Sequence, residues 1–355
     1  MTQRILVTGH RGYIGAVLVP MLEERGYQVA GVDADFFRGC DLVPDPVASD
    51  TIEVVAADVR DLTVDHLRGF DAVLHLAALS NDPLGKLDAA LTDEINHRAS
   101  VEAGRLAKEA GVRRFVFSSS CSLYGASTSD VPLGEEAAFN PVTAYGRSKV
   151  DAEHGLAELA DGDFTPVYLR NATAYGLSPR LRGDLVVQDL VASALFTGKI
   201  EILSDGSPWR PLVHVEDIAR AFVAVLEAPA EGVHNRAFNV GRSEENFTIA
   251  QVAEMVREGI PGSEIHYAPG GGPDARSYRV NFDTLPRVVS GFRPEWTVRK
   301  GITQLAEAYR AHGLGLEDLR GERFTRLARL QRLLDSGEVD ASLRWAGEPL
   351  ATMGT

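Results

Sequence analysis

Cysteine is scarce in this chain, with only Cys40 and Cys121 among 355 residues. Two cysteines cannot build the disulfide framework that stabilises many small secreted proteins. We therefore expect reduced thiols and a cytoplasmic location. The nine histidines and two cysteines form no cluster with the spacing of metal ligands, so the sequence predicts no metal site.

Excess positive charge and long apolar runs are also lacking. Lys and Arg number 36 against 50 Asp and Glu, which gives a formal net charge of -14. This balance argues against nucleic acid or an anionic membrane as the main partner, although it permits local basic pockets for phosphate. No apolar run approaches the roughly twenty residues that cross a bilayer, and the N-terminus turns into a glycine-rich loop by Gly9. We therefore expect neither an export signal nor a membrane span.

The N-terminal segment has the pattern of a strand, a glycine loop and a helix. Arg4 to Thr8 is a short apolar run, three spaced glycines follow, and Ala16 to Arg25 has helical periodicity. Such a loop brings backbone N–H groups and a helix N-terminus close to a dinucleotide pyrophosphate. The cofactor contacts expected from this loop are Gly9, Arg11, Gly12, Tyr13, Ile14 and Gly15.

An acidic residue follows the second apolar run, since Gln28 to Val32 leads into Asp33. A carboxylate at this place can accept hydrogen bonds from both ribose hydroxyls and would repel a 2'-phosphate, which favours NAD over NADP. Arg11 inside the glycine loop could pair with that phosphate, so its presence leaves NADP open.

Further cofactor contacts are expected where the following buried strands end, because cofactors bind at the carboxyl ends of parallel strands. Strands are predicted over Thr51 to Ala57, Ala72 to Leu76 and Arg113 to Phe117, and a long helix over Leu87 to Gly111. His75 is interpreted as a hydrogen-bonded core histidine. The contacts expected here are Asp58, Val59, Leu76, Ala77, Ala78, Asn96 and Ser118.

Tyr145 and Lys149 stand four residues apart, so that in a helix they share one face. Pro141 suits a helix start and Thr143 a cap, which favours that helix. A tyrosine with an ordinary pKa near about 10 is a poor base until a fixed cation stabilises its phenolate. Lys149 could be that cation, although such pairs arise often by chance.

Taken in order, these motifs resemble the extended short-chain dehydrogenase/reductase family of NAD-dependent sugar-nucleotide epimerases and dehydratases. The early part of the resemblance rests on T-G-x-x-G-x-x-G at Thr8 to Gly15, on Asp33, on S-S-S-C-S-L-Y-G at Ser118 to Gly125 and on Y-G-R-S-K at Tyr145 to Lys149. The later part rests on L-R-N-A-T-A-Y-G at Leu169 to Gly176, R-P-L-V-H-V-E-D at Arg210 to Asp217, F-N-V-G at Phe238 to Gly241 and P-D-A-R at Pro273 to Arg276. The resemblance covers about residues 3 to 310.

The resemblance implies an α/β fold with a Rossmann-type doubly wound parallel sheet and a smaller C-terminal α/β substrate domain. Residues 1–175, completed by segments near 210–240, would bind NAD, and residues 176–355 would mainly bind substrate, with a helical extension from about Leu314. Within that extension, Arg320 to Trp345 has Arg and Leu at helical spacing, which predicts a docked terminal helix or a partner surface. The family also implies a homodimer that pairs through Leu87 to Gly111 and Thr143 to Ala160.

By the same resemblance Tyr145 is the base that takes a proton from a sugar hydroxyl, Lys149 tunes its pKa and anchors the cofactor ribose, and Ser120 orients the same oxygen. The implied substrate is a nucleotide-diphosphate sugar. The basic loop Ser178 to Gly183 offers Arg180 and Arg182 as possible phosphate ligands, and the family's Asn in L-R-x-x-N falls on Thr173 here. The expected substrate contacts are Ser120, Ser122, Asn171, Arg180, Arg210 and Arg276.

The triplet Ser120-Cys121-Ser122 bears on the type of reaction. Family 4,6-dehydratases resemble T-D-E at these positions, and Cys121 and Ser122 cannot transfer protons as those carboxylates do. Cys121 is interpreted as a small packed residue. The remaining set resembles the 4-epimerases, which oxidise carbon 4 transiently and retain NAD. An NAD(P)-dependent ketoreductase or dehydrogenase would need the same residues, whereas a non-enzymatic NAD sensor would not need Ser120, Tyr145 and Lys149.

Overall fold

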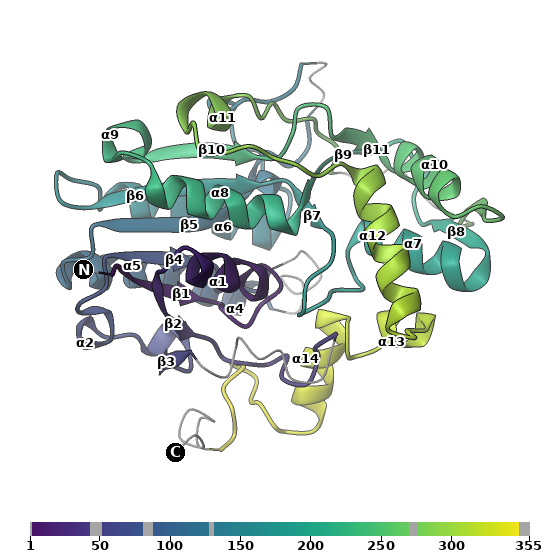
Figure 1. Ribbon diagram of the computed structural model, residues 1–355. Coiled ribbons are helices and arrows are strands. Elements are labelled where there is room, and N and C mark those ends of the chain that lie inside the picture. Colours follow the sequence, from purple (N-terminus) through teal and green to yellow (C-terminus); the bar gives the residue numbers. More distant parts are fainter. Residues whose placement is uncertain (1, 43–51, 81–87, 128–130, 270–275, 348–355) are drawn as a thin grey trace.

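The main sheet of this computed structural model contains seven parallel strands, in the order β10-β6-β5-β4-β1-β2-β3 (Figure 1). The structure describes residues 2–42, 52–80, 88–127, 131–269 and 276–347. The strands are β1 (Arg4–Thr8), β2 (Gln28–Val32), β3 (Glu53–Ala56), β4 (Ala72–His75), β5 (Arg114–Ser120), β6 (Thr165–Asn171) and β10 (Arg236–Val240). This order, with helices on both faces, is that of a doubly wound Rossmann fold and confirms the predicted fold class.

Both faces of the sheet are buried, which explains why its strands read as continuous apolar runs. Ile5 and Val7 of β1 belong to one core cluster and Leu6 to another, because successive side chains of a strand point to opposite faces. Helices α1 (Gly15–Glu24) and α8 (Val215–Glu227) pack together on one face. The other face carries α5 (Ala99–Glu109) and α6 (Ala144–Ala157), which lie side by side behind the sheet in Figure 1.

The second region has its own core and two small sheets. Strands β7 (Thr173–Tyr175), β9 (Trp209–His214) and β11 (Asn246–Thr248) form one sheet, and β8 (Lys199–Ile202) pairs with β12 (Glu264–Tyr267). Around them lie α7 (Val186–Thr197), α10 (Ile249–Gly259), α12 (Val298–Ala311) and α13 (Leu316–Arg320). Shorter turns of helix are η1 (Val59–Asp61), α2 (Val64–Leu67), η3 (Cys121–Tyr124), α9 (Ala230–Val233) and α11 (Thr284–Val288).

The expected single helix from Leu87 to Gly111 is interrupted. Leu87 lies outside the described residues, and the helix consists of α4 (Ala89–Asp93), a π-helical turn η2 (Glu94–Arg98) and then α5. Single π turns are rare and often stand at functional sites. Here the turn contains Asn96. Its side-chain oxygen accepts a hydrogen bond from the Leu79 N–H at 2.7 Å, and its amide nitrogen donates one to the Leu79 carbonyl at 3.1 Å.

The C-terminal helix α14 (Arg326–Asp335) is docked, as the spacing of its leucines predicts. It packs against the first half of the chain and not against the core of the second region. Leu330 and Leu333 are buried with Leu91 and Ile95 of the interrupted helix. Helix α14 therefore lies on the side of the main sheet that carries β2 and β3, whereas α13 of the same extension packs against α7 (Figure 1). In the part of the chain that is described, no helix is both long and apolar enough to cross a bilayer.

A buried ion pair ties α6 to the main sheet. Arg170 of β6 donates two hydrogen bonds to Glu153 of α6, at 2.7 and 3.0 Å, and both side chains are buried. Ser119 donates to the same carboxylate at 2.5 Å, while Arg170 also donates to Tyr124 Oη and to the Glu135 carbonyl. Arg170, conspicuous in the L-R-x-x-N motif, thus has a structural role at the strand ends.

Replacing Glu153 by alanine (E153A) should lower the free energy of unfolding by about 3–5 kcal/mol, because the Arg170 guanidinium would stay buried without its carboxylate. Urea unfolding measures the change. Glu158 is exposed at the end of the same helix, so E158A should change stability by no more than about 0.5 kcal/mol. Equal losses in the two variants would contradict this account of the ion pair.

Candidate active site

A cavity of about 830 Å³ lies at the carboxyl ends of the main-sheet strands, between that sheet and the second region. Of the expected cofactor contacts it is lined by Gly9, Gly12, Tyr13, Ile14, Gly15, Asp33, Asp58, Val59, Leu76, Ala77, Ala78, Ser118, Tyr145 and Lys149. Of the expected substrate contacts it is lined by Ser120, Ser122, Asn171, Arg210 and Arg276. Among the described residues expected at the site, Arg11, Asn96 and Arg180 are not part of this lining.

The three glycines of the loop stand at positions where a side chain would collide with, or press closely on, neighbouring backbone atoms. A Cβ on Gly15 would lie 2.3 Å from the Gly9 carbonyl oxygen, and one on Gly12 would lie 3.0 Å from it. Gly9 has φ +73°, and a Cβ there would stand 2.9 Å from the backbone nitrogen of Ala77. The loop therefore opens the N-terminus of α1 directly onto the cavity, which suits the diphosphate of a dinucleotide.

Thr8 at the end of β1 holds the neighbouring strand end in place. Its hydroxyl accepts hydrogen bonds from the N–H groups of Leu76 and Ala77, each at 3.1 Å. It also lies 3.0 Å from Nδ1 of His75, whose Nε2 lies 2.9 Å from the Ser100 hydroxyl. Burial, aided by the charge of Lys149, lowers the pKa of His75 to about 3. His75 is thus the neutral, hydrogen-bonded core histidine that the sequence predicts.

Asp33 stands at the cavity wall with its carboxylate fixed by backbone groups. The N–H of Arg11 and the N–H of Asp35 each donate to it at 2.8 Å. The Arg11 guanidinium turns away to the Asp35 carboxylate, at 2.7 Å. Burial and the neighbouring Asp33 raise the pKa of Asp35. Arg11 is thus engaged with a carboxylate, and the paired acids disfavour a 2'-phosphate at this place.

Asn96 acts one layer behind the cavity. Its bonds to Leu79 hold the backbone next to Ser80, and Leu79 and Ser80 both line the cavity. The amide also donates to the Ser148 hydroxyl at 3.3 Å, which links the π turn to the helix that carries Tyr145. The structure therefore places Asn96 as a support of the cavity wall, although the sequence analysis expected a cofactor contact.

Lys149 is buried beneath Tyr145, one helical turn away. Thr143 caps α6 by accepting a bond from the Gly146 N–H at 3.0 Å, which fixes the start of this helix as predicted. The Lys149 ammonium donates to the Ser118 carbonyl at 2.7 Å and lies 5.7 Å from the centre of the Tyr145 ring. An ammonium has three donors, so two remain for the phenol side and for a ribose.

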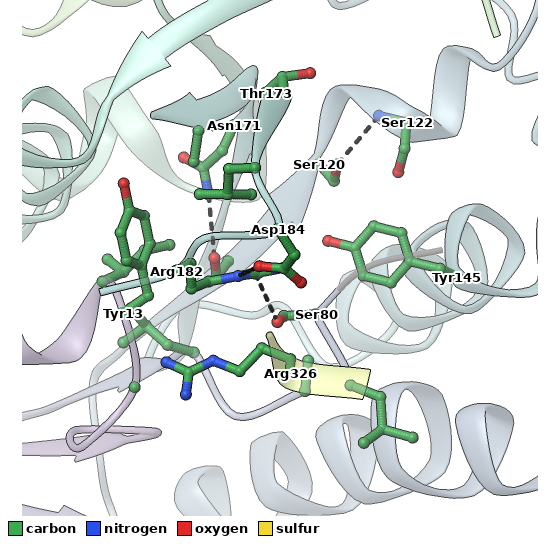
Figure 2. Close-up of a pocket in the computed structure, with 18 of the residues that line it drawn as sticks. Tyr13, Ser80, Ser120, Ser122, Tyr145, Asn171, Thr173, Arg182, Asp184 and Arg326 are labelled. Carbon is green, nitrogen blue, oxygen red and sulfur yellow. Dashed lines mark hydrogen bonds and ion pairs between the residues drawn. The ribbon is translucent and has the colours of Figure 1, made fainter. Parts of the chain in front are cut away.

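Ser120 ends β5 and faces the same space as Tyr145. Its hydroxyl oxygen accepts a bond from the Ser122 N–H at 3.1 Å, and its own hydrogen can still be donated. Figure 2 shows the Tyr145 phenol pointing into the cavity, with Ser120 and Ser122 close to it. Cys121 is buried and donates to the Arg170 carbonyl, so it is the packed residue that the sequence analysis expected.

Three buried polar atoms of lining residues have no hydrogen-bond partner among the described residues, and two of them, the Ser122 hydroxyl and the Asn171 side-chain oxygen, come from the strand ends of the main sheet. The Asn171 amide nitrogen is held by the Ser118 hydroxyl at 3.1 Å, which orients the oxygen. Unpaired buried polar atoms are costly unless a ligand or water satisfies them. Their place in the cavity fits a ligand rich in hydroxyl groups.

The arginines of the basic loop separate into two roles. Arg180 is buried outside the cavity lining, where its Nε lies 2.9 Å from Asp41 and its Nη1 donates to the Phe37 carbonyl. Arg182 lines the cavity and forms two bonds of 2.9 Å with Asp184, while it donates to the Ser80 hydroxyl at 3.2 Å (Figure 2). Arg182 is thus the better placed of the two for a phosphate.

The other two expected phosphate ligands lie in the second region. Arg210 of β9 and Arg276 both line the cavity, and the Arg210 guanidinium donates to the Arg276 carbonyl and to the Trp209 carbonyl. Arg210 belongs to a strand of the second region, whereas the glycine loop follows β1 of the main sheet. Within the described residues, a cluster of potential metal ligands, Asp93, His97 and Asp151, is found outside this lining.

Arg326 of α14 also lines the cavity, although it was not among the residues predicted for the site. The signal was its position on the apolar stripe of the helix, because Arg326, Leu330 and Leu333 follow each other at spacings of four and three. All three are buried. A buried arginine on such a stripe needs hydrogen-bond or ionic partners, and only the tertiary structure shows which groups lie near it.

The charge of Lys149 should make stability depend on pH. Burial lowers its pKa from 10.5 to about 7, and Glu153 partly opposes this. Between about pH 7 and 10.5 the unfolded chain therefore keeps a proton that the folded protein has released, and the free energy of unfolding of the NAD-free protein rises with pH. Below about pH 7 the folded protein carries the full cost of the buried charge.

Replacing Lys149 by methionine (K149M) should remove that cost. The variant should be more stable than the wild type at about pH 6, by a few kcal/mol, and this advantage should shrink as the pH rises toward about 10. Urea unfolding of both NAD-free proteins across this range measures the difference. K300M, at an exposed position of α12, should differ from the wild type by the same amount at each pH. An advantage of K149M that does not change with pH would contradict the buried charge.

Comparison with known proteins agrees with this geometry. The chain is 31% identical over 316 residues to a UDP-glucose 4-epimerase of Mycolicibacterium smegmatis, which covers 86% of this chain and 98% of the relative. It is 29% identical to a UDP-glucose 4-epimerase of Corynebacterium glutamicum, with 86% and 95% covered. UDP-glucuronic acid decarboxylases of Arabidopsis thaliana are similar at 26–27% identity.

Solved structures resemble the whole fold. MoeE5 in complex with UDP-glucuronic acid and NAD superposes with a TM-score of 0.74 at 27% identity, covering 87% of this chain and 99% of that chain. The UDP-glucose 4-epimerase of Thermotoga maritima with UDP-glucose gives a TM-score of 0.75 at 25% identity, covering 88% and 100%. The family model of the NAD dependent epimerase/dehydratase family matches residues 5–241. The chain therefore belongs to the NAD-dependent epimerase/dehydratase family.

Proposed function

We propose that the protein interconverts the 4-epimers of a nucleotide-diphosphate sugar through transient oxidation at carbon 4. The observation that carries this is the gathering of Ser120, Tyr145 and Lys149 at one cavity with the glycine loop and Asp33. Bound there, NAD, the cofactor of the family, would supply the acceptor and donor of the hydride that leaves the sugar carbon and returns to it. The named UDP-glucose 4-epimerases among the relatives favour a UDP-sugar as substrate.

The side chains of this chain supply binding and proton transfer. Tyr145 takes the proton of the sugar hydroxyl as oxidation proceeds and returns it on reduction. The Lys149 ammonium beneath it stabilises the phenolate, and Ser120 donates to the same sugar oxygen. In the presence of a negatively charged phenolate, Lys149 keeps its proton more readily than in the empty cavity. Arg210 and Arg276, which also line the cavity, would hold the substrate diphosphate.

Among the described residues that line the cavity, no carboxylic acid is suited to expelling water, which disfavours the 4,6-dehydratase reaction. Among the described residues, Asp184 is the carboxylate closest to this role, since Figure 2 shows it across the cavity from Tyr145. It is bound on both oxygens by Arg182. Although burial opposes ionisation, the Arg182 guanidinium lowers the pKa of Asp184, so it would stay a carboxylate. Such a group holds Arg182 in place and is a poor proton donor.

The predicted organisation follows from the same proposal. We infer an NAD-binding part made of residues 1–175 with segments near 210–240, and a substrate-binding part that is mainly 176–355. The joining of β10 to the main sheet supports the first. We also infer a homodimer formed by the outer surfaces of α5 and α6, as in the family, and a cytoplasmic location. Both cysteines are free, buried thiols, which suits a reducing compartment.

An epimerase returns its hydride and needs no external reductant. The purified protein should therefore contain bound NAD and convert a UDP-hexose to its 4-epimer without added cofactor, as followed by NMR. UDP-, dTDP-, GDP- and CDP-sugars should be compared in the same assay, because this comparison measures which nucleotide the enzyme accepts. A strict requirement for added NADH or NADPH would sink the epimerase proposal and favour a ketoreductase.

Replacing Tyr145 by phenylalanine (Y145F) should lower kcat by about 100-fold to 10,000-fold, because the reaction loses its base. The NAD content and the thermal stability should stay close to those of the wild type. Y168F is a matched control, since the Tyr168 hydroxyl bonds Asn235 and Tyr168 does not line the cavity. Unchanged turnover in Y145F would refute the assigned base.

A further inference from the structure

The segment from Arg320 to Trp345, called the C-terminal segment below, lies over the loop that follows β2. Trp345 donates through its indole to the Ala34 carbonyl at 2.6 Å. Arg329 donates to the carbonyls of Phe36 and Arg38, each at 3.1 Å. This loop begins with Asp33, the expected ligand of the adenosine ribose. Side chains of the segment thus hydrogen-bond to the backbone carbonyls of three residues of this loop.

The same segment also reaches the end of β3. Arg60 donates to the Ser342 carbonyl at 2.9 Å, and Arg344 lies 2.5 Å from Asp61 and 3.4 Å from Asp58. Asp58 and the neighbouring Val59, two expected cofactor contacts, line the cavity. The C-terminal segment therefore bridges two strand ends, β2 and β3, that frame the adenosine half of the site. All of it lies beyond residue 241, where the match to the family model ends.

One side chain of this segment enters the cavity. Arg326 is 3% exposed, and its guanidinium stacks 3.8 Å above the Phe37 ring. Nη2 donates to the Arg180 carbonyl at 3.4 Å, whereas the buried Nη1 has no hydrogen-bond partner among the described residues. A buried guanidinium with an unpaired donor is costly, so the site is incomplete without an acceptor.

The charges around Arg326 call for an anion. Burial and the nearby cations Arg182 and Arg180 lower its pKa to about 9, and Asp184 offsets this only in part. Asp184 is already bound on both oxygens by Arg182. Arg180 is likewise paired with Asp41, so Arg326 is the member of this group of arginines that has no carboxylate partner among the described residues. A diphosphate would supply the missing negative charge and the acceptor for Nη1.

The position of Arg326 points to the cofactor rather than the substrate as the source of this diphosphate. Its partner Phe37 belongs to the loop after β2, and both line the cavity together with Gly12 and Tyr13 of the glycine loop. The expected substrate arginines Arg210 and Arg276 belong to the second region. Figure 2 shows the Arg326 guanidinium on the side of the cavity where Tyr13 lies, away from Ser120 and Ser122.

We propose that Arg326 binds the diphosphate of NAD and that the C-terminal segment, by carrying this arginine and covering the adenosine half of the site, slows the release of the cofactor. The inference rests on the proposed function, because a retained cofactor is what a 4-epimerase needs. Its test does not depend on turnover, since the exchange of bound NAD can be measured in a protein that epimerises no sugar.

The test compares variants of the purified holoenzyme by the rate at which bound NAD exchanges with an excess of isotope-labelled NAD. R326M, which keeps the apolar stem but removes the charge, should exchange at least about tenfold faster than the wild type. R326K, which keeps the charge, should lie between them. R332Q is the matched control, because Arg332 lies on the same helix and pairs with Glu322 and Glu338. It should exchange within about threefold of the wild type.

The outcomes distinguish two roles of Arg326, binding a ligand through its charge and packing on Phe37. Equal acceleration in R326M and R326K would overturn the proposal, since it would mean that packing on Phe37 matters and the charge does not. Unchanged exchange in R326M would overturn it as well. If R326M does not fold, R326K carries the test, because lysine keeps the charge but lacks the second terminal nitrogen of the guanidinium. Exchange at the wild-type rate in R326K would then overturn the proposal.

Binding of two probes identifies which diphosphate is bound. ADP-ribose and UDP are titrated into NAD-free wild type and R326M. The proposal expects R326M to bind ADP-ribose at least about tenfold more weakly and UDP with unchanged affinity. A loss confined to UDP would assign Arg326 to the substrate and overturn the proposal. Absence of epimerisation together with the expected exchange rates would refute the proposed function and leave this inference standing.

Discussion

The close approach of Gly9 to its neighbours is the constraint on which the site depends. At this point the end of β1, the start of α1 and the end of β4 meet so closely that a single Cβ would collide with backbone atoms. Thr8 completes the junction by binding two N–H groups at the end of β4. Because the strands are parallel, their carboxyl ends open onto the same cavity, and the expected cofactor contacts from five strands line it.

Charge is the second organising factor, since the cavity gathers Lys149, Arg182 and Arg326 under or along its wall. Each side chain is buried, and the free-energy cost of burying its charge is offset in a different way or to a different extent. Lys149 bonds a carbonyl and loses proton affinity, Arg182 holds a carboxylate on both oxygens, and Arg326 has a donor left over. For Lys149 and Arg326 these differences agree with the proposed roles, namely stabilising a phenolate and binding an anionic ligand.

Much of the site could be predicted because its elements are local in sequence. The glycine loop, the acid after β2 and the Tyr145–Lys149 pair each depend on spacing within one strand, turn or helix, and the structure places all of them at one cavity. The prediction was less successful where contacts join distant segments. Arg180 and Arg182 are two residues apart in the same loop, yet the first is engaged with Asp41 and the second lines the cavity. Asn96 likewise supports Leu79 from behind, through a π turn that the helical pattern did not indicate.

The sequence by itself predicted the cofactor loop and the Tyr145–Lys149 pair, because backbone geometry and periodicity are encoded over a few neighbouring residues. It predicted the doubly wound fold through the resemblance of its ordered motifs to a known family. The tertiary structure alone decided which arginines meet the cavity and where the C-terminal segment docks. An arginine on an apolar stripe satisfies the same helical pattern whether it faces a partner protein, a carbonyl or a cofactor. That choice for Arg326 depends on packing between α14 and residues more than two hundred positions earlier in the chain, and no local pattern records it.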